Sequence, residues 1–453
     1  MNSDFPAEFP DRTPKGIAAV IARAITSGTL ASGHRLPTVR ELGGELGVSP
    51  ATVSHAWRAL ARAGLIDSRG RAGTFVRDTA PTWLTPRVHR MSTPHDPIRL
   101  DLSRGTPDPL LLPSLGPALA RLGARAETGS YQDLPVVPEL ARSLEASWPW
   151  RAEAITVVDG ALDGIVRTLE QLVRFGDRVV VESPGFPPFF DILEALGAEA
   201  VPVALDEHGI RPDELARALP RRPVALLLQP RAQNPTGASM TAERAAELAR
   251  VIDRSEDAAS LVVVEDDHSG QISTAPDVSL GTLLPDRVVH VRSFSKSHGP
   301  DLRIAALGGP ARVVDRVVAR RMLGPGWTSR MLQTILVELL ADGTSIDQVA
   351  EAMRRYHARQ RDVADALAAH GVHPARADGI NLWLPVASER SALVELAAAG
   401  IRVAPGGPFL AGAAAGGPEF VRVTVGMVRE DAAGVAAALA SAAGVPTARL
   451  ESR

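Results

Sequence analysis

The chain has 453 residues, of which 45% are hydrophobic, a formal net charge of −3 and no cysteine. This length predicts two or three domains with sizeable cores, and the lack of cysteine excludes disulfides and thiolate metal sites. No apolar run reaches the roughly 18 residues that a membrane-spanning helix needs, and residues 1–10 lack the apolar segment of a secretory signal. We therefore expect a cytoplasmic protein without a membrane partner or a metal site.

Positive charge is concentrated near the N-terminus. Between Arg12 and Arg77 lie ten cationic side chains and three acidic ones, although the chain as a whole is acidic. A basic segment joined to an acidic remainder favours a polyanionic partner for that segment, and DNA is one such partner.

Two helices are predicted at the start of this basic segment. The spacing of apolar residues predicts a helix over 17–25, and Gly28 is expected to end it. Thr38 is the expected N-cap of a second helix, because Glu41 stands at capping-box distance from it. Gly47 is expected to close this second helix.

A third helix and a hairpin follow. Ser49 is a suitable N-cap and Pro50 suits the first helical position. Gly64 is expected to end this helix, and two short strands are predicted over 65–68 and 74–76. A helix pair followed by a basic hairpin suits DNA, with the third helix in the major groove and the hairpin at the minor groove. The inner face of the third helix is predicted to carry Val53, Ala56, Trp57 and Leu60.

Four short motifs mark the first 78 residues. They are Gly33-x-Arg35-Leu36-Pro37-x-x-Arg40-x-Leu42, Val48-Ser49-x-x-Thr52-Val53, Leu60-x-x-x-Gly64-Leu65 and Gly73-Thr74-Phe75-Val76. As a set they resemble the DNA-binding domain of the GntR family. The resemblance implies a winged helix-turn-helix domain over 1–78 that binds double-stranded DNA. The residues that it implies in DNA contacts are Arg40, Ser49, Thr52, Arg69, Arg71 and Gly73.

The hairpin departs from the family at one position. The family's wing tip reads Gly-x-Gly, whereas Arg71 replaces the first of these glycines and Gly70 is displaced by one residue. The conformation of the wing therefore stays open at the level of the sequence. Residues 79–99 then carry four prolines without sustained periodicity. We predict an interdomain linker stiffened by proline, with an arm packed on the next domain as the alternative.

From Leu100 onward, apolar runs alternate with helical stretches rich in Ala, Leu and Arg. Such runs predict an α/β fold with a mostly parallel sheet that is covered by helices on both faces. Ligands of these sheets bind at the carboxyl ends of the strands, so polar residues directly after the runs are candidate site residues. The runs are 179–181, 200–203, 225–228, 261–264 and 288–291.

Lys296 is the most unusual of these polar residues, since it is one of only two lysines among 49 basic residues. Unlike arginine, a lysine can lose its proton and form a Schiff base with an aldehyde. Four further polar segments precede it in chain order. They are Asp159-Gly160-Ala161, Glu182-Ser183-Pro184-Gly185-Phe186, Asn234-Pro235-Thr236-Gly237 and Glu265-Asp266-Asp267-His268.

In this order the segments resemble those of the fold-type I pyridoxal-phosphate enzymes, the aspartate aminotransferase superfamily. The resemblance covers roughly residues 100–450 and implies a large domain over 100–310 and a smaller α+β domain over 311–453. It implies that pyridoxal 5'-phosphate is bound through a Schiff base with Lys296. Asp266 is implied to pair with the protonated pyridine nitrogen, which keeps the ring an electron sink, and Asn234 to donate to the phenolic oxygen.

The same resemblance implies the rest of the cofactor site. Phe186 is expected to stack on the ring, although a phenylalanine after a strand can also be a core residue, and Asn-Pro-Thr-Gly alone can be an ordinary turn. Tyr131 is implied to cross the interface of a homodimer to the phosphate of the neighbouring subunit. The residues implied around the phosphate are Asp159, Gly160, Ala161, Ser293, Ser295 and Arg303, through helix N–H groups, hydroxyls and a guanidinium.

Two more residues concern the ligand. Arg422 lies in the predicted strand 420–424 and is implied to bind the carboxylate of a ligand, with a solvent-facing arginine as the alternative. His268 stands where the family usually has a tyrosine that donates to the ring oxygen. A histidine can donate there, with a charge that changes near neutral pH, or it can simply fill the space. In both cases efficient transamination becomes a weaker expectation.

A GntR-type head on an aminotransferase-like body is the layout of the MocR subfamily of bacterial transcription regulators. The resemblance implies a regulator that senses an amine or amino acid through external aldimine formation at Lys296. Two alternatives stay open. One is an active aminotransferase with an accessory DNA-binding head, and the other is a sensor of pyridoxal phosphate itself.

Overall fold

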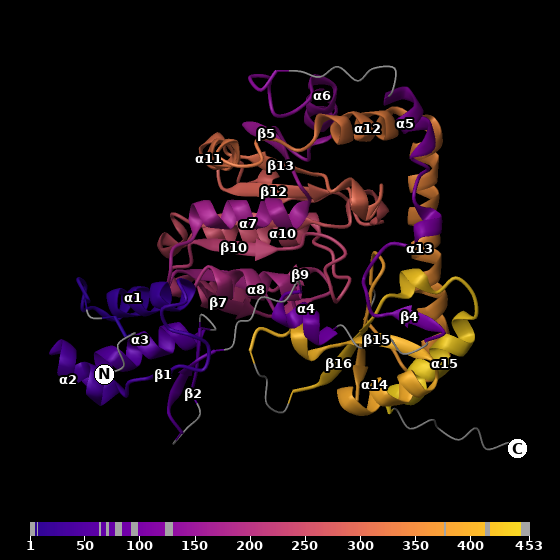
Figure 1. Ribbon diagram of the computed structural model, residues 1–453. Coiled ribbons are helices and arrows are strands. Elements are labelled where there is room, and N and C mark those ends of the chain that lie inside the picture. Colours follow the sequence, from indigo (N-terminus) through magenta and orange to yellow (C-terminus); the bar gives the residue numbers. More distant parts are fainter. Residues whose placement is uncertain are drawn as a thin grey trace, which may run out of the picture.

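The computed structural model describes residues 5–6, 8–62, 65–68, 72–77, 84–91, 98–122, 130–375, 377–412 and 417–444. In chain order these form a small N-terminal head, a large central sheet with its helices, and a second, smaller sheet (Figure 1). Within the described residues, every helix is too short or too polar to cross a bilayer.

The head consists of three helices and a three-stranded antiparallel sheet, as the GntR resemblance implies apart from one extra strand. The predicted capping box is present: Glu41 N donates to Thr38 Oγ1 at 3.2 Å, and Thr38 N donates to Glu41 Oε2 at 2.7 Å. The extra strand β1 has two residues, too few for any sequence periodicity. The elements are α1 (Pro14–Thr26), β1 (Arg35–Leu36), α2 (Val39–Leu46), α3 (Pro50–Arg62), β2 (Ile66–Ser68) and β3 (Thr74–Val76), with strand order β1-β3-β2.

The core of the head forms around the inner face of α3. The four residues predicted on that face, Val53, Ala56, Trp57 and Leu60, are all buried. Trp57 Nε1 also donates to the carbonyl of Pro37 at 3.3 Å, which fixes α3 to the start of α2. The core draws in two residues from outside the predicted helices and one from the body of the protein: Phe5, Phe9 and Phe175.

The central sheet has seven strands in the order β5-β13-β12-β11-β10-β6-β7. The sheet is mostly parallel, as predicted, and β13 pairs antiparallel with both of its neighbours. The predicted apolar runs lie in its strands. These are β5 (Ala154–Val158), β6 (Arg178–Glu182), β7 (Glu199–Val203), β10 (Ala225–Leu228), β11 (Val262–Asp267), β12 (Val288–Ser293) and β13 (Ala305–Gly309).

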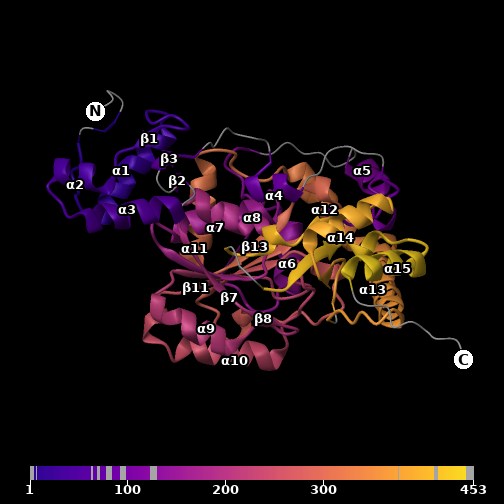
Figure 2. The ribbon, with the colours of Figure 1, turned by 90° about the horizontal axis from the view of Figure 1, so that it is seen from below.

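Helices cover both faces of this sheet, which explains why its strands are continuously apolar. On one face lie α7 (Ala161–Leu172), α8 (Pro187–Ala195) and α11 (Ala311–Met322). On the other lie α9 (Pro212–Ala218) and α10 (Ala242–Asp253), as the view from below makes plain (Figure 2). A short hairpin of β8 (Leu205–Asp206) and β9 (Gly209–Ile210) precedes α9.

The smaller sheet has the order β14-β16-β15-β4. Its first strand in the sequence, β4, pairs in parallel with β15, so the chain adds a strand to this sheet before it enters the central one. The domain boundaries expected from the sequence stay a prediction. The strands are β4 (Leu100–Leu102), β14 (Leu382–Val386), β15 (Ile401–Pro405) and β16 (Glu419–Val423), and α14 (Glu389–Ala398) and α15 (Ala432–Ala443) pack against them.

The remaining helices connect these parts. Figure 1 shows α13 (Gly343–Ala369) running from the level of α5 and α12 down to the smaller sheet. The others are α4 (Pro86–Met91), α5 (Gly116–Leu122), α6 (Pro138–Ser147) and α12 (Arg330–Ala341).

Part of the predicted linker forms α4, which packs on α8 of the body. Arg87 of α4 binds Asp191 with a nitrogen–oxygen distance of 2.6 Å and also pairs with Glu194. Its guanidinium lies 5.3 Å from the centre of the Phe190 ring. The described part of the linker is therefore the packed arm that the sequence left as an alternative.

Candidate functional site

The predicted polar segments meet at the carboxyl ends of the central strands. Lys296 follows β12, Asp266 lies in β11, and Asn234 follows β10 after a short loop. Lys296 interacts electrostatically with Arg422, which belongs to the smaller sheet, and with Asp266. The site therefore lies where the two sheets approach each other, as expected for an α/β fold.

Lys296 carries an amine that is poised to lose its proton. Burial, and then the charge of Arg422, lower the pKa of Lys296 to about 8, and Asp266 partly opposes them. A lysine with this pKa has a sizeable neutral, nucleophilic fraction near neutral pH, which an ordinary lysine lacks. Its Nζ donates to the carbonyl of Gly105, in the segment that follows β4.

Asp266 offers one free acceptor atom. Its Oδ2 accepts from Gln229 Nε2 at 2.7 Å, whereas Oδ1 is buried without a hydrogen-bond partner in the described residues. Burial raises the pKa of Asp266 to about 7, and the hydrogen bond from Gln229 opposes the rise. A buried acceptor without a partner is rare in folded proteins. A protonated pyridine nitrogen fits this atom, because it supplies both the missing hydrogen bond and a positive charge.

Gln229 is a site residue that the sequence analysis missed. It follows β10 directly and is 3% exposed. Besides its bond to Asp266, its Oε1 accepts from the backbone N of Asn234 at 2.8 Å. Gln229 stands at the end of a predicted strand, which is the sequence signal for a site residue, but it belongs to none of the family motifs.

An anion site forms at the start of α7. Gly160 is the N-cap of α7 and has a φ of 101°, and no side chain caps the first turn. A β-carbon at Gly160 would lie 2.5 Å from Nη2 of Arg303, so the guanidinium would have to move aside for any other residue, and the positive φ also favours glycine. Free helix N–H groups beside a guanidinium bind phosphate well.

The other residues predicted around the phosphate surround this helix start. Arg303 Nη2 donates to the carbonyl of Asp159 at 3.1 Å. Ser295 N donates to Ser293 Oγ at 3.2 Å, at the end of β12. The carboxylate of Asp159 is engaged by Arg321 and Thr328, so Asp159 anchors the turn with its side chain. Ala161 is the first residue of α7.

Phe186 and Tyr131 differ in their surroundings. Phe186 precedes α8, is half-buried and packs edge-on against Phe189, with 5.3 Å between ring centres. Tyr131 is 88% exposed and lies 6.1 Å from the ring of Trp327. Its exposure leaves it accessible to another chain.

His268 is neutral and its ring donor is already used. Nε2 lies 2.9 Å from the carbonyl oxygen of Ala232. Because a carbonyl can only accept, Nε2 carries the proton and Nδ1 is an acceptor. Burial, and then the charge of Lys296, lower the pKa of His268 to about 4. The charge of His268 therefore does not change near neutral pH, and the hydrogen donor of the family's tyrosine has no counterpart in this ring.

Arg422 is a buried cation, not the solvent-facing arginine of the sequence alternative. It is 3% exposed, donates to the carbonyl of Ser103, and places Nη1 3.5 Å from Asn234 Oδ1. Burial lowers the pKa of Arg422 to about 10, and Asp101 partly opposes this, so the group stays charged at neutral pH. Its Nε has no hydrogen-bond partner, and no carboxylate in the described part of the chain forms an ion pair with it.

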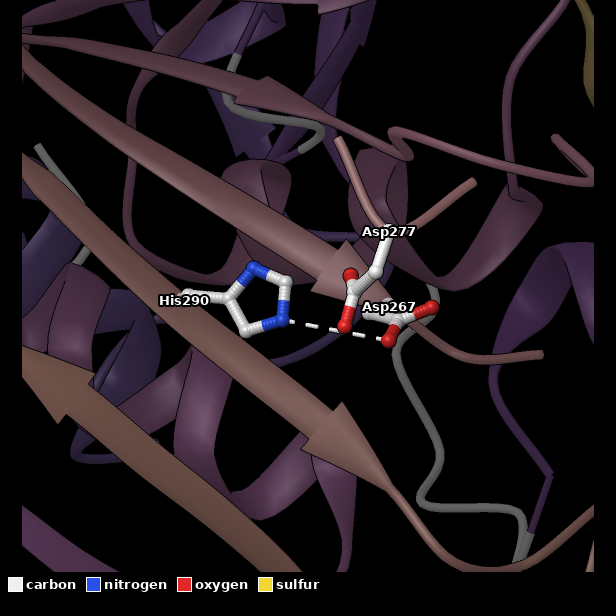
Figure 3. Close-up of side chains that lie close together, drawn as sticks. All are labelled: Asp267, Asp277 and His290. Atoms are coloured by element: carbon white, nitrogen blue, oxygen red, sulfur yellow. Dashed lines mark ion pairs between the residues drawn. The ribbon is translucent and has the colours of Figure 1, made fainter. Parts of the chain in front are cut away.

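A second cluster of titratable side chains consists of Asp267, Asp277 and His290 (Figure 3). His290 Nε2 lies 3.8 Å from Asp267 Oδ2, and Asp277 approaches both from a loop. Arg231 binds Asp267 through two hydrogen bonds of 2.9 and 2.7 Å, and Arg292 binds Asp277 at 3.2 Å. Burial raises the pKa of Asp267, but Arg231 outweighs it and lowers the value to about 2. A metal cation would have to compete with two guanidinium groups here, so the cluster serves as an ion network that fixes the strand ends.

Four of the six predicted DNA-binding residues lie in the described part of the head. Arg40 and Ser49 are exposed, and Thr52 is half-buried, with 2.8 Å between the hydroxyls of Ser49 and Thr52 at the start of α3. Gly73 has a φ of 113°, and a β-carbon there would lie 2.8 Å from Arg35 Nε. Glycine thus lets the hairpin strand pack against an arginine of β1. The remaining two, Arg69 and Arg71, lie outside the described residues.

Two family models match the chain, and together they span most of it. The model "Bacterial regulatory proteins, gntR family" matches residues 13–76. The model "Aminotransferase class I and II" matches residues 97–439. The first covers the head, and the second covers both sheets of the body.

Curated relatives share this two-part layout. The vitamin B6 salvage pathway transcriptional repressor PtsJ of Salmonella typhimurium is 36% identical over 379 residues, which cover 83% of this chain and 86% of PtsJ. The pyridoxine biosynthesis transcriptional regulator PdxR of Corynebacterium glutamicum is 29% identical over 383 residues, which cover 79% of each chain.

Among solved structures, the body is similar to LysN, an α-aminoadipate aminotransferase from Thermus thermophilus. The TM-score is 0.68 at 23% identity, and the match covers 80% of this chain and 98% of LysN. This likeness shows the fold alone. The unpartnered Asp266 Oδ1, the Gly160 helix start and the neutral fraction of Lys296 fit the cofactor of this family, pyridoxal phosphate. The chain belongs to the class I and II aminotransferase family and, with its gntR-family head, to the MocR-type transcription regulators.

Proposed function

We propose that this DNA-binding regulator senses an amine or amino acid at the Lys296 site and passes that event to its head. The observation that carries the proposal is Arg422, a buried guanidinium without a carboxylate partner among the described residues. A buried charge that forms no close ion pair is costly, and the more distant Asp101 compensates it only in part, so the site favours an anionic ligand group. An amino acid supplies a carboxylate for Arg422 and an amine for the Lys296 end.

The residues of the site support sensing more than turnover. Bound pyridoxal phosphate supplies an electrophilic carbon that reacts reversibly with primary amines. Lys296 supplies an amine whose lowered pKa suits this reversible attachment. The one ring N–H of His268 donates to the carbonyl of Ala232, so the hydrogen bond that tyrosine donates to the cofactor ring in related catalysts is missing. Amine capture does not depend on that hydrogen bond, whereas efficient transamination does.

The route to the head is short along the chain. Lys296 donates to the carbonyl of Gly105, and Arg422 donates to that of Ser103. Both acceptors lie directly after β4, which itself follows the linker that carries α4. A ligand that engages Lys296 and Arg422 competes with these two bonds and changes how the start of the body is held. Coupling of this kind is typically about 1–3 kcal/mol.

Exposed apolar residues support a homodimer. Several large hydrophobic side chains of the body lie open to solvent, and an interface with another chain would remove them from water. A second copy of the chain is the occupant that we propose, with Tyr131 reaching the phosphate site of its neighbour. The most exposed of these residues are Leu110 (74%), Tyr131 (88%), Leu134 (74%) and Leu323 (80%).

The proposal is tested by titrating the cofactor-loaded protein with a panel of amines and amino acids while its visible absorbance is followed. We expect a spectral change with a subset of amino acids, and no visible band at all in the Lys296→Ala variant. A band that survives in Lys296→Ala would overturn the attachment to Lys296. If no amine of the panel changes the wild-type spectrum, amine sensing is wrong.

A second candidate is a sensor of pyridoxal phosphate itself. It is favoured by the names of two relatives, since PtsJ is a regulator of vitamin B6 salvage and PdxR of pyridoxine biosynthesis. DNA binding by the cofactor-free and cofactor-loaded proteins, without any added amine, separates the two candidates. A difference at this stage supports the cofactor sensor, and a difference that needs the amine supports the amine sensor.

A further inference from the structure

Gln229 links Asp266 and Asn234, the two residues that are expected to hold the pyridine nitrogen and the phenolic oxygen of the cofactor. Its side-chain amide spans from Asp266 to the backbone of Asn234, with distances of 2.7 Å and 2.8 Å. Its own backbone N donates to Glu182 Oε2 at 3.1 Å. Through its side chain and its backbone, this one buried residue therefore connects the ends of three neighbouring strands, β6, β10 and β11.

The orientation of this amide is fixed by its neighbours. The N–H of Asn234 can only donate, so Gln229 Oε1 must face it. Nε2 is then left to donate to Asp266 Oδ2, and the reverse orientation would put two acceptors together and two donors together. This arrangement holds one oxygen of Asp266 and turns the other, Oδ1, into the unpartnered atom of the site.

Gln229 is a neutral hydrogen-bond donor to Asp266 among other buried carboxyl groups. Burial raises the pKa of Glu182 to about 8, with Asp266 adding to the rise, so this carboxyl is mostly protonated at neutral pH. Asp267 also raises the pKa of Asp266, whereas the Gln229 hydrogen bond, His290 and Lys296 lower it. Gln229 is thus the side-chain hydrogen-bond donor that favours the ionised form of Asp266, against the rise in pKa that burial and Asp267 cause.

We propose that Gln229 is a positioning residue, which holds the carboxylate of Asp266 and the Asn234 loop in the arrangement that binds the cofactor ring. The inference rests on the proposed use of pyridoxal phosphate at Lys296. Gln229 acts through Asp266 and Asn234, so the loss of its side-chain amide weakens cofactor binding without removing any group that the cofactor is expected to touch.

Two variants distinguish the contribution of the hydrogen bond to Asp266 from that of the hydrogen bond to Asn234. Gln229→Glu keeps an acceptor for Asn234 N and, when ionised, replaces the donor to Asp266 with a second acceptor, so it is compared with wild type above the pKa of about 8 that burial gives the neighbouring Glu182. Gln229→Met has a similar length and makes neither bond. A hydrogen bond to a charged group contributes about 1.5–3 kcal/mol, so we expect Gln229→Glu to bind pyridoxal phosphate about tenfold or more weakly. Gln229→Met is expected to lose at least as much.

A pH profile distinguishes positioning from a merely structural role. Cofactor affinity falls when Asp266 becomes protonated, and removing its donor raises the pKa of Asp266. The pH below which affinity is lost should therefore move upward in both variants. A change in thermal unfolding of the cofactor-free protein alone, with an unmoved pH profile, would contradict the proposal. Gln271→Glu makes the same chemical change at an exposed residue and is the control.

The Asp266→Asn background shows whether Gln229 acts through Asp266. Once Asp266 is neutral, Gln229→Glu should add little further loss of cofactor affinity, because coupled residues are not additive. Fully additive losses, or a Gln229→Glu affinity within twofold of wild type, would overturn the inference. A wild-type protein that takes up no pyridoxal phosphate contradicts the proposed function itself, which is a distinguishable result.

Discussion

Burial moves the two central titrating groups of the site in opposite directions. It lowers the pKa of Lys296 to about 8 and raises that of Asp266 to about 7. Desolvation disfavours the charged form of each group, so a cationic group loses its proton more easily and a carboxyl holds its proton longer. The site can therefore present a neutral amine and an ionised carboxylate together only from about neutral pH upward.

This leads to a prediction for cofactor uptake. Raising the pH deprotonates Lys296, so the rate at which cofactor-free protein takes up pyridoxal phosphate should rise with pH and reach half its maximum near 8. The appearance of the visible absorbance band, followed by rapid mixing from pH 6 to 10, measures this rate. A rate that is still rising steeply at pH 10, as the ordinary lysine pKa of about 10.4 implies, would show that the pKa of Lys296 is not perturbed.

Arg422 gives a prediction about ligand choice. Arg422→Met keeps much of the length of the side chain but removes the positive charge. We expect this variant to lose at least about tenfold in affinity for an amino acid that changes the wild-type spectrum, because charge-assisted pairs are strong. Its affinity for the matching amine without a carboxylate should change little. Arg390→Met, at an exposed position of α14, is the control. Equal losses for both ligands would show that Arg422 does not bind a carboxylate.

At the residue scale, the position of polar residues at strand ends predicted much of the site. The hydrogen bonds of these residues to distant backbone groups could not be predicted. Lys296, Asp266 and Asn234 could be predicted because polar residues after apolar runs gather at one edge of a parallel sheet. The neutral state of His268 could not, because it depends on the carbonyl of Ala232, which no sequence pattern marks. Gln229 stands at a predicted strand end, but its role comes from two contacts that only the folded chain shows, one with Asp266 of the neighbouring strand and one with the backbone of Asn234.

At the scale of elements, α4 and β4 show what local patterns leave out. Both are short, and each is held by a distant segment: α4 by α8, and β4 by β15. Apolar spacing predicted α3 because one face of this helix is buried, and continuous apolar runs predicted the central strands because both of their faces are buried. With six and three residues, α4 and β4 are too short to show apolar periodicity, so only the folded chain reveals them.

The Arg87 clamp gives a prediction at this scale. Arg87→Met removes the ion pairs of α4 with Asp191 and Glu194 and should loosen the arm. We expect unchanged affinity for pyridoxal phosphate but a loss of most of the effect of the amine ligand on DNA affinity. Arg217→Met breaks an exposed ion pair on α9 and should preserve that effect. If Arg87→Met responds to the ligand like wild type, then α4 does not transmit the signal.

At the scale of the whole molecule, the head packs directly on the body. Phe175, from the loop between α7 and β6, joins the core cluster of the head. Sequence patterns predicted each part separately, since each has its own core. Patterns within a domain carry no information on contacts between domains, so this contact was not predicted.

The proposed homodimer can be tested with one surface variant. Leu323→Asp places a charge on a side chain that is 80% exposed within the described chain, and it should convert a dimer into a monomer. Val394→Asp makes a similar change at a residue of α14 that is 66% exposed, and it should leave the dimer intact. Sedimentation or light scattering measures the mass, and a wild-type monomer would contradict the proposed homodimer.

The central claim is that an event at Lys296 changes DNA binding by the head. The most direct test measures the affinity of cofactor-loaded protein for its selected operator fragment, with and without an amino acid that changes its spectrum. We predict a shift of about 5- to 150-fold in wild type and none in Lys296→Ala. The same DNA affinity with and without the ligand in wild type, or an equal shift in Lys296→Ala, would contradict the account.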